Sequence, residues 1–169
     1  MSVFRYDRRL GEGLRSAADG VRGGRPLARL IARAMSPVFQ LAVGAAIADR
    51  GTRGTGIRML IAGAGAATAA RVLRDGIGRQ RPGERANGGF PSRHAAAAGA
   101  ISIAAGTRRP LLGLGLGAAA LVGSLGRIAS AEHEPADIVA GMALGALVGC
   151  LVAAPLVPAR FALRGARIP

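Results

Sequence analysis

Two histidines, the only ones in the chain, have neighbours that suit catalysis. His133 precedes Asp137 by four residues, so the carboxylate can accept a hydrogen bond from one nitrogen of the imidazole ring. Such a bond fixes the tautomer and leaves the second nitrogen able to attack an electrophile. The pattern predicts a nucleophilic histidine. The alternative is that Asp137 caps a helix beginning at Pro135 and that His133 is an ordinary surface residue.

The second histidine, His94, ends the segment Pro91-Ser92-Arg93-His94, which lies directly before an apolar stretch. Ser92 is a suitable N-cap, and the first N–H groups of the following helix would then be directed at the loop. A helix N-terminus attracts anions, so His94 in the first turn would face a bound phosphate. The alternative is a capped helix start with an incidental histidine.

Arginines accompany both histidines. Arg74 and Arg81 are seven residues apart, so they project from one face of a helix that Pro82 ends. Two guanidinium groups on one face can bind a phosphate, although the same pair at a membrane edge could hold lipid headgroups. Two histidines and an aspartate could also bind zinc, but these arginines would repel a cation. The cluster therefore favours an anion and no metal.

The composition indicates a membrane environment and an anionic partner. Half of the 169 residues are hydrophobic, 27 are glycine and only 3% are aromatic, which suits close helix packing in lipid. The 23 basic residues are all arginine and give a net charge of +14. That charge indicates anionic lipid, a phosphate ester or nucleic acid. Nucleic acid is not expected as a partner, because one Tyr and no Trp leave little for base stacking.

Five apolar stretches follow the arginine-rich N-terminus, at residues 37–48, 59–70, 95–107, 110–126 and 138–159. The last is long enough to cross a bilayer and the fourth comes close, whereas the first three rely on flanking arginines that snorkel. Strand signals are sparse. We expect an all-α, integral-membrane bundle of five to six helices.

We further expect two parts in the chain. Residues 1–34 form a basic amphipathic segment at the membrane surface, or alternatively a disordered basic tail, and residues 35–169 form the membrane domain.

The order of these stretches predicts where the polar segments meet. Residues 95–107 and 110–126 form a hairpin, which returns the chain to the membrane face from which it started. The polar segments 71–94 and 127–137 therefore lie on one side, and the active site is expected at one membrane face. Glycines at every fourth position from Gly141 to Gly149 form a flat helix face for packing, within or between chains.

The motifs resemble those of the type 2 phosphatidic acid phosphatase superfamily, which also contains the vanadium haloperoxidases. Its signature has a basic residue, six intervening residues and Arg-Pro, and then Pro-Ser-Gly-His. A third part has Ser-Arg, five intervening residues, a His, three intervening residues and an Asp. The matching segments here are 74–82, 91–94 and 126–137, with all gaps kept. Three residues depart from it: Arg74 replaces Lys, Arg93 replaces Gly and Gly126 replaces Ser.

The resemblance implies a role for each residue. His133 would attack phosphorus and form a phosphohistidine, Asp137 would orient it, and His94 would protonate the leaving oxygen and later help water to attack. The phosphoryl oxygens would be bound by Arg74, Arg81, Ser92 and Arg127. Arg93 would either add a further phosphate ligand or crowd the pocket.

Together these features predict a metal-independent lipid phosphatase without a cofactor, belonging to the membrane branch of the superfamily. Its substrate would be a phosphomonoester or diphosphate of a polyprenyl or glycerophospholipid. We expect a multi-pass protein of the cell membrane with its active site on the extracytoplasmic face. The alternative is a non-catalytic protein that binds anionic headgroups. Haloperoxidase chemistry is disfavoured, because those relatives are large and soluble.

Overall fold

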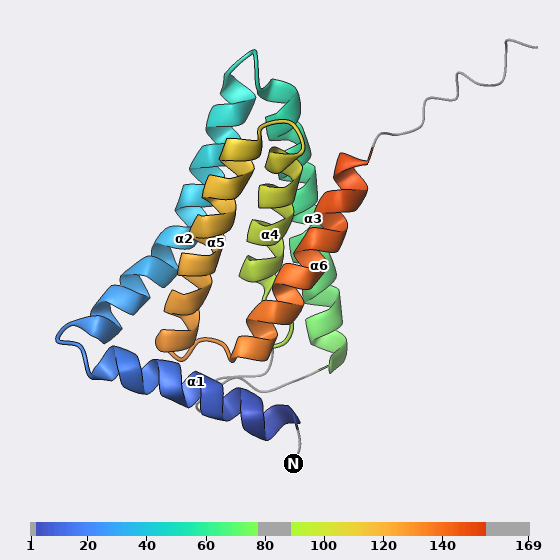
Figure 1. Ribbon diagram of the computed structural model, residues 1–169. Coiled ribbons are helices and arrows are strands. Elements are labelled where there is room, and N and C mark those ends of the chain that lie inside the picture. Colours follow the sequence, from blue (N-terminus) through green and yellow to red (C-terminus); the bar gives the residue numbers. More distant parts are fainter. Residues whose placement is uncertain (1–2, 78–88, 155–169) are drawn as a thin grey trace, which may run out of the picture.

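A computed structural model describes residues 3–77 and 89–154, and all regular elements in these ranges are helices. They are α1 (Val3–Asp19), α2 (Gly24–Ala48), α3 (Arg53–Ile77), α4 (Arg93–Gly106), α5 (Pro110–Ala129) and α6 (Pro135–Ala153). Helices α2 to α6 run up and down as a bundle, and α1 lies across one end of it (Figure 1). The predicted all-helical bundle is confirmed.

Four helices, α2, α3, α5 and α6, are long and apolar enough to cross a membrane. Both α2 and α3 have 25 residues, so each extends beyond its apolar stretch, 37–48 or 59–70, as expected if the flanking arginines snorkel. The helices continue through the arginine-bearing turns on either side of each apolar stretch. Long arginine side chains can carry their charge to the interface while the backbone stays helical.

The fifth bundle helix, α4, has only 14 residues and lies at the centre of the bundle. Most of its residues are buried, and it packs against α3, α5 and α6. Because protein surrounds most of its surface, its length does not have to match a bilayer. Alanine dominates its sequence, so the neighbouring helices can approach closely.

The predicted hairpin is confirmed in α4 and α5, which are joined by a short turn after Gly106. A side chain at Gly113 would collide with the backbone of Gly106, so these two glycines let the helices meet at the turn. The hairpin brings the end of α5 back to the level at which α4 begins (Figure 1).

The predicted glycine face packs against α4 within the chain. Gly141, Gly145 and Gly149 are all buried on α6. A methyl group at Gly145 would collide with the carbonyl oxygen of Ala96, and one at Gly141 would lie 2.5 Å from the carbonyl oxygen of Ser92. The three glycines therefore set the distance between the two helices.

The N-terminal part turns sharply between α1 and α2. Gly23 has a φ of 80°, a left-handed conformation that glycine adopts without a Cβ clash. Helix α2 begins at Gly24 and runs without interruption through residues 34 and 35, where the sequence suggested a boundary between two parts. That division remains a prediction.

Replacing Gly145 by alanine should destabilise the bundle by about 1–3 kcal/mol, because the added methyl group meets rigid α4 backbone. The matched control is Gly117→Ala on α5, where an added Cβ meets open space. The thermal unfolding midpoint in detergent should fall for the first variant and stay level or rise for the second. Equal midpoints for the two variants would contradict this account of the α4–α6 contact.

Candidate active site

The polar residues gather at the end of the bundle over which α1 lies. The start of α4, the end of α5, the start of α6 and the C-terminal end of α3 all lie there (Figure 1). The α5–α6 loop, residues 130–134, connects two of these helix ends and carries His133. The described parts of the two polar segments that the sequence placed on one side, 71–77 with 89–94 and 127–137, therefore lie at the same end of the bundle.

The centre of this cluster is a buried pair, His133 and Asp137, which are 2% and 0% exposed. Nδ1 of His133 lies 3.3 Å from Oδ2 of Asp137, and the same oxygen accepts the backbone N–H of Glu134 at 3.0 Å. An ionised carboxylate only accepts, so the hydrogen bond requires the proton on Nδ1. In the neutral ring, Nε2 then keeps its lone pair and can act as a nucleophile.

Asp137 is the third residue of α6, where the helix dipole and unsatisfied N–H groups attract a negative charge. A negative charge beside Nδ1 also favours the cation that forms when Nε2 attacks an electrophile. The pair thus has the geometry of a nucleophile and its orienting carboxylate.

Ser92 joins the two polar segments. Its Oγ lies 3.4 Å from Nε2 of His133 and accepts the N–H of Ala95 at 3.4 Å, as expected of an N-cap. Its backbone N–H donates to the carbonyl oxygen of Asp137 at 2.9 Å. Ser92 is fully buried, so it fixes the start of α4 against the start of α6.

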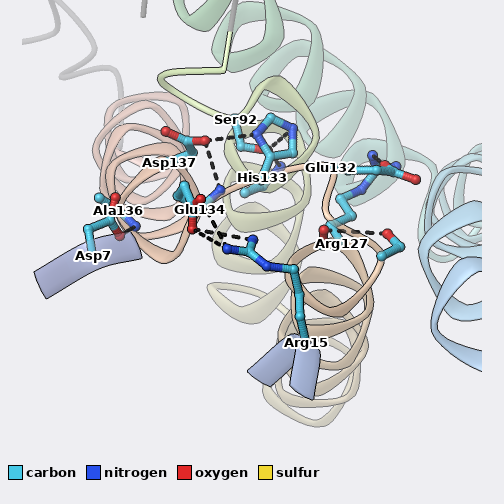
Figure 2. A network of polar contacts seen from close by, with 11 residues as sticks. Asp7, Arg15, Ser92, Arg127, Glu132, His133, Glu134, Ala136 and Asp137 are labelled. Carbon is cyan, nitrogen blue, oxygen red and sulfur yellow. Dashed lines mark hydrogen bonds and ion pairs between the residues drawn. The ribbon is translucent and has the colours of Figure 1, made fainter. Parts of the chain in front are cut away.

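Arg127, in the last turn of α5, is buried and shapes the loop that follows. Its guanidinium donates to Glu132 at 2.7 Å and to the carbonyl oxygen of Ala32 on α2 at 3.2 Å (Figure 2). Its own carbonyl oxygen accepts the N–H groups of Glu132 and His133 at 2.9 and 3.3 Å. Sequence reasoning missed Glu132 and the contact with α2, which lies 95 residues away along the chain.

The remaining predicted residues lie around this centre. Arg74 is in the last turn of α3 and is paired with Asp75 at 3.4 Å. Arg93 is exposed and His94 is half-buried at the start of α4. Arg81 lies outside the described residues. The structure thus joins His133, Asp137 and Ser92 directly, with Arg127 connected through the loop backbone.

A groove of about 530 Å³ lies between α2, α3 and α4. Arg93 and His94 line it at the start of α4, and its walls along the bundle are mostly apolar, including Phe39, Val43, Leu60 and Ile101. The groove therefore connects a cationic end beside the polar cluster with an apolar interior.

Helix α1 also contributes to the cluster, which the sequence analysis did not foresee. Asp7 accepts the N–H of Ala136 at 2.8 Å, and Arg15 pairs with Glu134 at 3.3 Å (Figure 2). Burial raises the pKa of Glu134 above its ordinary value, and the guanidinium of Arg15 opposes that shift. The spacing of Asp7, Gly11 and Arg15, four residues each, is a signal of one helix face that could have revealed this contact.

No group of three or more His, Cys, Asp or Glu side chains in the described part of the chain could hold a metal ion. The cluster instead holds the His133 imidazole against Asp137 and Ser92, while Arg127 and Arg15 bind the carboxylates of Glu132 and Glu134 in the same loop. Such a site can bind an anion and transfer an electrophilic group to Nε2.

Comparison with known proteins agrees with this arrangement. A profile of the PAP2 superfamily matches residues 55–159, which include every predicted site residue. The fold is similar to that in the crystal structure of the first transmembrane PAP2 type phosphatidylglycerolphosphate phosphatase from Bacillus subtilis. That likeness has a TM-score of 0.65 and 21% identity over 86% of this chain and 83% of the other. No curated protein gives a significant sequence match.

Replacing Asp137 by alanine should lower the free energy of unfolding by about 2–4 kcal/mol, because it leaves two buried donors without an acceptor. Asp137→Asn should lower the free energy of unfolding by less, since its amide oxygen can still accept one of the two hydrogen bonds. Asp75→Ala, which breaks an exposed pair on α3, is the control and should change stability little. Unfolding midpoints in detergent should rank wild type above Asn and Asn above Ala, and any other order would contradict the buried network.

Proposed function

We propose, since the chain belongs to the PAP2 superfamily, that it is a membrane phosphatase which removes a phosphate from a lipid through a phosphohistidine at His133. The observation that carries the proposal is the buried His133–Asp137 pair, with Nε2 facing Ser92, which is followed in the chain by the Arg93 and His94 that line the groove. A nucleophile, an orienting carboxylate and a second imidazole are the groups that a two-step phosphoryl transfer needs.

In the first step, Nε2 of His133 attacks phosphorus and the bond from phosphorus to the lipid oxygen breaks. His94, protonated when a phosphate dianion lies beside it, gives its proton to the leaving oxygen. Asp137 holds the Nδ1 proton and stabilises the positive charge that the ring gains. In the second step, His94 takes a proton from water, which attacks phosphorus and releases phosphate and the free imidazole of His133.

The phosphoryl oxygens are assigned to Ser92 and to the arginines, Arg74, Arg81, Arg93 and Arg127. Phosphoryl transfer depends mainly on positioning and on neutralising the charge of the equatorial oxygens. Guanidinium groups can supply that charge, so the proposal requires no metal ion and no cofactor.

The groove supports a lipid as the substrate. Its apolar walls suit a hydrocarbon chain, and the arginine and histidine at one end suit the phosphate of the same molecule. A lipid can diffuse in the bilayer and enter between α2, α3 and α4 without leaving the membrane. Polyprenyl phosphates or diphosphates and phosphorylated glycerolipids both have this division into an anionic head and an apolar tail.

The charges at the end of the bundle opposite the site support one orientation of the protein in the membrane. Arginines lie at the turns between α2 and α3 and between α4 and α5, namely Arg50, Arg53, Arg58, Arg108 and Arg109. Short loops rich in arginine favour the cytoplasmic side, and the site arginines are discounted because phosphate requires them. The arginine-rich N-terminal segment at the site end favours the opposite orientation. From the short loops, we propose that the active site lies on the extracytoplasmic face.

The alternative function is binding of anionic lipid headgroups without turnover. The same arginines would serve that function, but it gives no reason for a buried imidazole oriented by a carboxylate. Phosphate release therefore separates the two functions.

In detergent, His133→Ala should abolish phosphate release from a panel of lipid phosphates. His94→Ala should slow release by about 10²–10⁴-fold, the usual contribution of a general acid or base. With an activated aryl phosphate, whose leaving group needs no proton, His94→Ala should still become phosphorylated and accumulate an acid-labile phosphohistidine.

The control is Arg58→Gln, at the far end of the bundle, which should keep wild-type turnover and should not accumulate phosphoenzyme. Chelating agents should leave the wild-type rate unchanged. Retained phosphate release in His133→Ala would overturn the assignment of the nucleophile, and a wild type that binds these lipids without hydrolysing them would favour the alternative.

A further inference from the structure

Two polar side chains stand in the otherwise apolar part of the groove. Ser36 and Gln40, one helical turn apart on α2, both line it. Gln40 lies within the apolar stretch 37–48 of a helix that is suited to cross a membrane. An amide in hydrocarbon is costly unless it is hydrogen-bonded, and polar groups inside membrane-crossing helices commonly serve binding.

The depth of these side chains follows from the contact between Arg127 and the carbonyl oxygen of Ala32. That contact shows that the turn of α2 at Ala32 lies beside Arg127, at the site end of the bundle. Ser36 and Gln40 then lie about 6 and 12 Å further along the helix axis, at 1.5 Å per residue. Beyond Gln40 the groove is lined by Val43, Leu60 and Ile101. Along the groove, a cationic end is therefore followed by a level at which Ser36 and Gln40 stand beside Met35 and Phe39, and then by an apolar end.

We propose, building on the function proposed above, that Ser36 and Gln40 bind an oxygen-bearing spacer between the phosphate and the hydrocarbon of the substrate. The ester carbonyls of a glycerophospholipid or the hydroxyl groups of a lipid-linked sugar provide such acceptors and donors. A polyprenyl phosphate, in which the phosphate is attached directly to hydrocarbon, leaves Gln40 without a partner. The site therefore selects against polyprenyl phosphates.

Three substrates test this selection in wild type and in Gln40→Leu: phosphatidic acid, a polyprenyl-linked sugar phosphate and polyprenyl phosphate. Wild type should prefer one of the first two, and which one it prefers identifies the spacer. Gln40→Leu should lower kcat/KM for that substrate by about tenfold, the loss expected for one hydrogen bond, and should raise kcat/KM for polyprenyl phosphate, which no longer leaves an amide without a partner. Leu41→Ala, the next residue on α2, which does not line the groove, is the control and should affect neither.

The proposal would be overturned if Gln40→Leu lowered kcat/KM equally for all three lipids or for none of them. A wild-type preference for polyprenyl phosphate would also overturn it. Each of these results would leave the phosphatase function intact. Hydrolysis of none of the three by wild type would instead count against the proposed function itself and this proposal with it.

A separate observation concerns α1, which meets the α5–α6 loop with one face. Asp7, Gly11 and Arg15 form this face, and a side chain at Gly11 would collide with the carboxylate of Glu134. Asp7 is buried, and Arg15 and Glu134 have side chains that are 15% and 7% exposed. Figure 2 shows both polar contacts beside the histidine. The close approach therefore depends on the missing side chain at Gly11.

The two contacts reach residues directly next to the catalytic pair. Glu134 follows His133, and its N–H donates to Asp137. Ala136 precedes Asp137, and its N–H donates to Asp7. The loop is thus held from the bundle by Arg127 and Asp137, and from the outside by α1.

We infer that Asp7 and Arg15 are positioning residues for His133 in the proposed reaction. They act through the loop backbone and touch neither the phosphate nor the reacting nitrogen. Their loss should therefore slow attack by Nε2 without weakening lipid binding, because the groove between α2, α3 and α4 does not include them.

Asp7→Ala and Arg15→Gln should each lower kcat and the rate of phosphohistidine formation by about tenfold, with KM unchanged. Asp7→Asn should keep most of the wild-type kcat, because its amide oxygen can accept the same N–H. The controls, Glu12→Gln and Arg9→Gln, change exposed charges on the same helix and should leave both constants at their wild-type values.

Three outcomes would overturn this inference. The variants could raise KM while kcat stays constant, or Asp7→Asn could lower kcat as much as Asp7→Ala does. The third outcome is a fall in kcat that only matches the fall in the fraction of folded protein. Failure of the wild type to form phosphohistidine would instead count against the proposed nucleophile.

Discussion

The start of α6 lies directly against the start of α4 because Gly141 has no side chain to separate them. This approach allows the N–H of Ser92 to donate to the carbonyl oxygen of Asp137, and it brings the Ser92 hydroxyl to the imidazole of His133. The two residues that contact the imidazole come from different helices. The geometry of the site therefore depends on a backbone contact that any larger residue at 141 would widen.

A site for an anion has to neutralise its own carboxylates, which would otherwise repel a phosphate. The segment 132–137 contains three of them, and each has a partner. Glu132 pairs with Arg127, Glu134 with Arg15, and Asp137 with His133 and the N–H of Glu134. Burial raises the pKa of Glu134, and the guanidinium of Arg15 opposes that shift. These pairings hold the loop in place.

The small side chains of the bundle serve two functions at once. They let α4 fit within the bundle even though it is too short to cross a membrane by itself. The start of α4 carries Ser92, Arg93 and His94, so central placement of this helix puts its N-terminus, with its affinity for anions, between the loop and the groove. Close packing in lipid and the proposed phosphate site therefore depend on the same alanine-rich helix.

The sequence by itself determined the helices, the hairpin, the glycine face and the spacing of His133 and Asp137. Each of these follows from residues within a few positions of one another, where hydropathy, capping and helical periodicity act. The apolar stretches mark only the central parts of α2 and α3, because the arginine-bearing turns at their ends are helical as well. Only the tertiary structure decided that Arg127 binds Ala32, that Arg15 binds Glu134 and that Ser36 and Gln40 share a groove with His94. These contacts join segments far apart in the chain, and local periodicity carries no information about which distant surfaces meet.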